Sequence, residues 1–189
     1  MEYLTFGWNV AEAVVAIVAG LAAGSIALIG FGADSCIESL SGAVLWWRLR
    51  RHDDDERRER LAVRLVGVSF LALAAYVAFD ATLSLARREP PESSTVGIVL
   101  AAASLIVMPL LARAKRRVAA QLDSRALQAD SRQTDLCACL SAILLCGLAL
   151  NALVGWWWAD PLAALLMAPI IIREGVGALR GETCETCEH

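Results

Sequence analysis

Two carboxylates one helical turn apart are the residues of this sequence best suited to chemistry. Asp34 and Glu38 lie in the stretch GSIALIGFGADSCIES, which covers residues 24–39. Residues four apart share one face of a helix. The surrounding run, from Ser25 to Trp47, is otherwise apolar apart from small hydroxyls and one thiol. Because ionised carboxylates in hydrocarbon are costly, such a pair faces a partner, a cation or a water-filled cavity. The pair therefore predicts a site for a positive charge within a membrane.

A second set of polar residues, in the apolar run over 124–151, follows helical spacing. Asp130, Gln133 or Thr134, Cys137 and Ser141 fall on one helix face, whereas Asp135 lies about 200° round from Cys137. The pair Gln133 and Cys137 is again four residues apart.

Facing Asp34 and Glu38, the second pair would complete a set of four metal ligands, with Asp130 as a further candidate. Carboxylate oxygens, an amide oxygen and a thiolate suit tetrahedral Zn²⁺ or Cd²⁺ better than Mg²⁺ or Ca²⁺. The alternative is that these polar groups only link helices to one another.

Three further groups are weaker candidates. Glu12, near the middle of the first apolar run, is either an interhelical hydrogen-bonding group or a proton relay beside the metal site. His52 and Asp53, in a mixed-charge segment, form a metal entry site or are simply solvated. The tail contains one Cys-x-x-Cys pair, Cys184 and Cys187, and a histidine, His189. These residues either bind metal or belong to a disordered end.

Long apolar runs must position these residues. The 189-residue chain is 58% hydrophobic and has a mean hydropathy of +0.56, too apolar for an ordinary soluble domain. A spanning helix needs about 20 apolar residues. We therefore predict an all-α, polytopic six-transmembrane-helix bundle over residues 1–180 and a short tail over 181–189. The predicted spans are about 4–23, 25–48, 61–86, 95–112, 124–151 and 160–180, with Asp160 as N-cap of the last and Pro161 at its first position.

The basic residues predict the orientation. Six arginines lie at or between the facing ends of the second and third spans, over residues 48–60, and five basic residues lie at or between those of the fourth and fifth spans, over residues 113–125. The connection between the third and fourth spans contains two arginines, and the one between the fifth and sixth contains none. The positive-inside rule therefore places both termini in the cytoplasm.

The composition also excludes several classes of protein. Four of the six cysteines, Cys36, Cys137, Cys139 and Cys146, lie in apolar runs, so they are expected to be thiols in lipid rather than a disulfide framework. No cleavable signal peptide is evident, since the first apolar run has no basic segment before it. The sequence shows no nucleophile–base set, no phosphate-binding loop and no sign of nucleic-acid binding, so an enzyme is not expected.

Together these motifs resemble the cation diffusion facilitator (cation efflux) family over roughly residues 5–180. The resemblance rests on six spans, on the span-two motif ending in Asp-Ser-x-x-Glu-Ser, on Ala-Asp-Ser in span five and on Asp160-Pro161. It implies a multi-pass protein of the cell (inner) membrane that exports divalent metal by alternating access, in exchange for protons and as a homodimer. Zn²⁺ or Cd²⁺ would be the transported ion, with no prosthetic group.

The sequence departs from the family pattern in two respects. The resemblance implies two acids on span two, which fall on Asp34 and Glu38, and a His-x-x-x-Asp pair on span five, which falls on Gln133 and Cys137. Glutamine cannot titrate and a thiolate prefers softer ions. The family's C-terminal cytoplasmic domain is also expected to be absent, which leaves a dimer to form through the membrane helices. A membrane metal-binding or sensing protein that does not transport is the alternative function.

Overall fold

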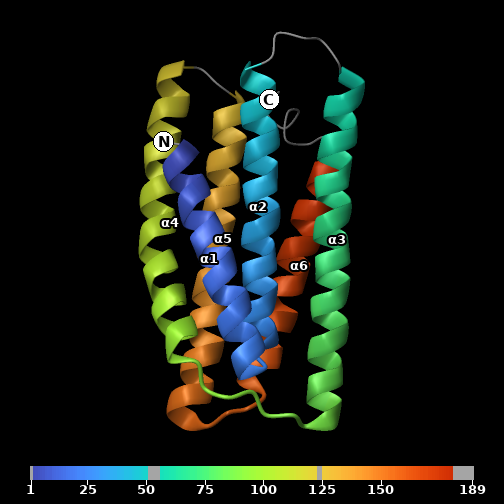
Figure 1. Ribbon diagram of the computed structural model, residues 1–189, viewed down its shortest axis with the longest axis vertical. Coiled ribbons are helices and arrows are strands. Elements are labelled where there is room, and N and C mark those ends of the chain that lie inside the picture. The colour runs from blue at the N-terminus through green and yellow to red at the C-terminus, as the bar shows by residue number, and fades with distance from the viewer. Residues whose placement is uncertain (1, 51–55, 123–124, 181–189) are drawn as a thin grey trace.

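The protein is a bundle of long antiparallel helices (Figure 1). The computed structural model describes residues 2–50, 56–122 and 125–180, and these contain helices and connecting turns but no strand. The helices are α1 (Glu2–Ala23), α2 (Ile26–Arg50), α3 (Glu56–Arg87), α4 (Thr95–Leu122), α5 (Arg125–Val154) and α6 (Ala159–Arg180). The prediction of an all-α, six-helix bundle is confirmed.

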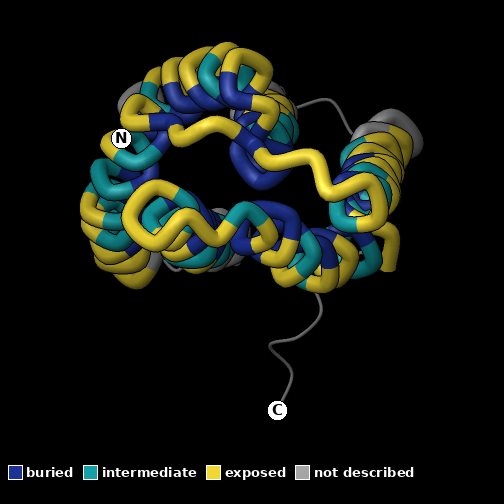
Figure 2. The backbone as a smooth tube through the Cα atoms, turned by 90° about the horizontal axis from the view of Figure 1, so that it is seen from below, coloured by how far each residue is buried: buried dark blue, intermediate teal, exposed yellow. Residues whose placement is uncertain are grey.

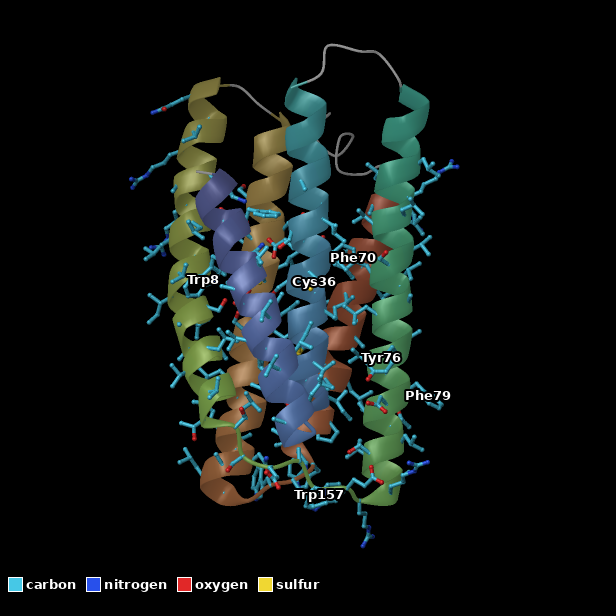
Figure 3. All side chains as sticks on the ribbon, in the orientation of Figure 1. Trp8, Cys36, Phe70, Tyr76, Phe79 and Trp157 are labelled. Carbon is cyan, nitrogen blue, oxygen red and sulfur yellow. The ribbon has the colours of Figure 1, made fainter. Side chains whose placement is uncertain are left out.

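The outer surface of the bundle is apolar. Among the described residues, α1, α3, α4, α5 and α6 are long and apolar enough to cross a membrane. The 25-residue α2 is also long enough, but it carries Asp34 and Glu38. Large apolar side chains such as Val18, Phe79 and Ile106 are exposed, and exposed positions lie on the outside of the bundle in Figure 2. Figure 3 shows Phe79 pointing away from the bundle. The chain is therefore a multi-pass integral membrane protein.

Each helix packs mainly against one neighbour: α1 against α2, α3 against α6, and α4 against α5. Helix α2 also contacts α3, α5 and α6, which places it at the centre of the bundle. Small residues allow close helix contact in a membrane. A Cβ atom on Gly32 would lie 2.8 Å from the Ile17 side chain of α1, and Phe31 and Leu28 are fully buried beside this contact.

The first turn of α2 is held by a residue from α6. Asp160 accepts hydrogen bonds from Ser25 Oγ at 2.6 Å and from the Ile26 backbone N at 3.0 Å. We expected Asp160 to be the N-cap of its own helix, and this was wrong. Helix α6 already begins at Ala159, and the carboxylate caps α2 instead, because the exposed backbone N–H groups at that end need acceptors.

The position of the basic residues after the predicted fourth span also differs from expectation. It was expected in the connection after the fourth span, but α4 continues helically to Leu122, so Arg113–Arg117 lie on its last turns. Arg116 forms an ion pair with Asp135 of α5. This ion pair lies between α4 and α5, which are close neighbours along their length.

Candidate metal site

A small cavity inside the bundle brings the predicted ligands together. Its volume is about 270 Å³, including space open to the surroundings. Its polar lining consists of Asp34 and Glu38 from α2, Gln133 and Cys137 from α5, and Glu174 from α6. Its apolar lining consists of Phe70, Leu136, Leu140, Ile170 and Ile171. The two i, i+4 pairs predicted to face each other therefore line the same space.

On α2, the two carboxylates are buried on the face that lines this cavity. Asp34 is 7% exposed and Glu38 is 6% exposed. Ser39, the residue after Glu38, donates its hydroxyl to the backbone carbonyl of Ser35 at 2.9 Å. Within the described part of the chain, Asp34 has no hydrogen-bond donor or cationic partner in contact. A buried carboxylate in this position is suited to binding a cation.

On α5, the structure decides which residue of the Gln133–Thr134 pair faces the site. Gln133 lines the cavity, and its Oε1 accepts a 3.4 Å hydrogen bond from Ser41 of α2. Thr134 is buried on the side of α4, where it accepts a 3.3 Å hydrogen bond from Lys115 Nζ. Cys137, one turn beyond Gln133, is 2% exposed. Asp135 pairs with Arg116 away from the cavity, as its helical angle predicted.

Glu12 of α1 contacts three other helices next to the cavity, namely α2, α4 and α5. Its carboxylate accepts hydrogen bonds from Ser35 of α2 at 2.9 Å and from Ser104 of α4. The Cys137 thiol also lies 3.9 Å from Glu12 Oε2. The interhelical hydrogen bonds that we considered for Glu12 are therefore present, and its contact with Cys137 places it directly behind the cavity wall.

The comparisons with known proteins agree with this geometry. Residues 3–182 match the cation efflux transmembrane domain. The chain belongs to the cation efflux family. It is 27% identical over 163 residues to the cation-efflux pump FieF of Shewanella oneidensis, covering 82% of this chain and 55% of that protein. It is also 27% identical over 168 residues to an uncharacterized transporter of Synechocystis, covering 83% and 54%. This cation efflux chain thus spans about half the length of these curated relatives.

The cavity of this cation efflux protein offers three carboxylates, one amide and one thiol. Within the described residues, no three His, Cys, Asp or Glu side chains converge closely enough to form a ready-made metal cluster. The donors therefore surround a space rather than a single point, and they would have to move inward to coordinate one ion together. The apolar half of the lining, including Phe70 and Leu140, limits access of water to it.

Some predicted candidates lie outside the described residues. These are His52, Asp53, Cys184, Cys187, His189 and the side chain of Asp130. In contrast, Glu174 lines the cavity although our sequence analysis did not select it. Glu174 follows the apolar run Pro169–Ile172 after one intervening residue, Arg173, so the available signal was an acid next to the apolar part of a predicted span.

Proposed function

We propose that this cation efflux protein transports a divalent metal cation out of the cytoplasm. One observation carries the proposal: two pairs of polar residues from two helices line one cavity inside a membrane-embedded bundle. These residues are Asp34 and Glu38 of α2 and Gln133 and Cys137 of α5. Buried acids with these neighbours are costly unless a cation binds them. The name of the Shewanella relative, a cation-efflux pump, supports the same direction of transport.

The donor types favour Zn²⁺, with Cd²⁺ as the nearest alternative. Two carboxylates, an amide oxygen and a thiolate make a mixed set of four ligands, which suits a tetrahedral ion of borderline softness. Mg²⁺ keeps several waters and prefers an octahedral oxygen shell, while Ca²⁺ takes six to eight oxygens. A site with a thiolate and a largely apolar wall is poorly suited to either.

The remaining parts of the proposal concern direction and partners. The excess of basic residues in two of the five connections favours cytoplasmic termini. We infer that the protein works in the cell membrane by alternating access, exchanges metal for protons, and forms homodimers through its helices. Glu12 is the candidate proton carrier, because a buried carboxylate in contact with Cys137 can receive a proton without leaving the bundle.

Metal flux into proteoliposomes tests this proposal. Wild-type protein should transport Zn²⁺ in a panel that also contains Cd²⁺, Mn²⁺, Co²⁺ and Fe²⁺. Asp34→Asn and Glu38→Gln should each reduce the flux to background while the protein remains folded. Asp80→Asn is the matched control, since Asp80 lies on α3, interacts with Tyr76 and does not line the cavity.

Two outcomes would contradict the proposal. If Asp34→Asn or Glu38→Gln transported metal at the wild-type rate, these carboxylates would not be the metal-binding residues. Metal binding by the wild type without any flux would favour the alternative function of a membrane metal-binding or sensing protein, because both functions require the site but only one moves the ion.

A further inference from the structure

Helix α6 contributes a third carboxylate to the cavity, in addition to the two from α2. Glu174 lines the same space as Asp34 and Glu38. In the described part of α5, the cavity-lining residues are an amide, a thiol and two leucines, Leu136 and Leu140. The third acid therefore enters the cavity from α6, the helix that also contributes Ile170 and Ile171 to its lining.

An ionised Glu174 adds negative charge to the cavity that Asp34 and Glu38 line. Because Glu174 and Asp34 line the same cavity, their carboxylates repel one another when both are ionised. Within the described residues, neither of the two accepts a hydrogen bond or forms an ion pair. The residue before Glu174 is a cation, Arg173, and its side chain is exposed. Two like charges that face one buried space favour a cation between them.

The position of Glu174 is set by the packing of α6 against α3. A Cβ atom on Gly175 would lie 2.9 Å from the backbone O of Gly67, and one on Gly67 would lie 2.9 Å from the backbone O of Gly175. This reciprocal close contact fixes how far α6 approaches α3 and how it is rotated. Glu174 is the adjacent residue, about 100° round the helix, and its side chain lines the cavity rather than the α3 contact.

We propose that Glu174 is a metal-binding residue, so that the divalent cation is held between α2, α5 and α6. This inference rests on the proposed function, because it adds a ligand to the same site. With Asp34 and Glu38 it gives the cavity three carboxylates, which compensate for the neutral amide of Gln133. Movement of α6 against α2 would then change the distance between ligands, which links metal binding to the arrangement of the helices.

Zn²⁺ binding to purified full-length protein, measured by calorimetry, tests this inference. Loss of even an outer partner of a metal ligand costs roughly 10–100-fold in affinity, so Glu174→Gln should weaken Zn²⁺ binding at least tenfold. Asp80→Asn, which also removes one acid from a helix but not from the cavity, should leave binding unchanged. Unfolding temperatures of both variants show whether the protein is intact.

A second variant gives a signal that a purely structural role would not produce. In a Cys184→Ser/Cys187→Ser background, Glu174→Cys should raise Cd²⁺ affinity relative to Zn²⁺ and strengthen the thiolate-to-cadmium ultraviolet absorption. Gly177→Cys, three residues further along α6 and outside the cavity lining, should do neither.

The outcomes separate this inference from the function on which it rests. If the wild type binds Zn²⁺, Asp34→Asn abolishes binding and both Glu174 variants behave like wild type, the role of Glu174 is overturned and the transport proposal stands. If the wild type binds no metal, or Asp34→Asn binds it normally, the proposed function fails first.

Discussion

At the scale of single residues, Cys137 is the most unusual of the proposed ligands. It is buried, lines the cavity and also contacts Glu12 through its thiol. A thiolate ligand shifts the preference of a site from hard towards softer ions. Cys139 and Cys146 lie on the same helix but are exposed, so Cys137 is the one thiol of the described part of α5 that reaches the cavity.

Replacing this thiol with a carboxylate should therefore change which ion is preferred. We expect Cys137→Asp to lower the ratio of Cd²⁺ to Zn²⁺ flux, because it exchanges a soft sulfur ligand for a hard oxygen ligand. The measurement is competition between the two ions in proteoliposomes, with Cys139→Ser as the control that keeps the ratio. A ratio that does not move in Cys137→Asp would show that the thiol only packs.

At the scale of helices, close contacts between small residues hold the elements that carry the site. Gly67 and Gly175 allow the backbones of α3 and α6 to touch, and the Asp160 carboxylate ties the start of α6 to the start of α2. Both contacts involve α6 and the second also involves α2, and these two helices carry the three acids of the cavity. Small-residue contacts of this kind are typical of helix packing in membranes.

A methyl group added at Gly175 should lower the stability of the protein, because α3 and α6 are in close contact there. Gly175→Ala places a Cβ 2.9 Å from a backbone oxygen and 3.0 Å from Leu71, so helix α3 or α6 must shift. We expect a loss of about 1–3 kcal/mol in the free energy of unfolding, the usual cost of overpacking. Gly177→Ala, where nothing lies within 4 Å, should be neutral or stabilising by up to about 1 kcal/mol through helix propensity.

Unfolding in detergent with increasing denaturant would measure both glycine variants side by side. Equal stability of Gly175→Ala and Gly177→Ala would contradict the close α3–α6 contact. A stability loss confined to Gly175→Ala would support it, since the two positions differ in their surroundings and not in the type of change.

At the scale of the whole molecule, the proposed exchange of metal for protons requires a buried titratable group near the cavity. Glu12 is 1% exposed, is bonded to α2 and α4, and touches Cys137 of α5. The charged and titratable groups nearest the cavity side of this contact are Asp34, Glu38 and Cys137 itself. A carboxylate with these neighbours is placed to exchange a proton when the ion enters or leaves.

Glu12→Gln should therefore leave Zn²⁺ binding largely intact and weaken the dependence of flux on a pH gradient. The amide oxygen can accept from one of Ser35 and Ser104, and the amide NH2 can donate to the hydroxyl oxygen of the other, so the helix contacts are preserved while the titrating group is removed. Flux into vesicles with and without the gradient, for wild type and variant, provides the measurement. A wild-type flux that ignores the gradient would make the protein a passive facilitator and Glu12 a structural residue.

The sequence alone was sufficient for the number and type of helices and for the faces within each helix. The length of the apolar runs identifies a membrane bundle, because the bilayer sets the length of a spanning helix. Spacing of four places Asp34 with Glu38, and Gln133 with Cys137, because the helical repeat is local geometry. Both pairs line the cavity as their spacing indicated.

Only the tertiary structure decided what surrounds each face. The rotation of a helix depends on packing against residues distant in sequence, such as Gly67 against Gly175. This packing brings Glu174 into the cavity, directs Thr134 towards Lys115 and leaves Gln133 at the site. The Asp160 carboxylate likewise caps α2 rather than its own helix, because the free N–H groups of α2 come within its reach only when α2 and α6 pack together.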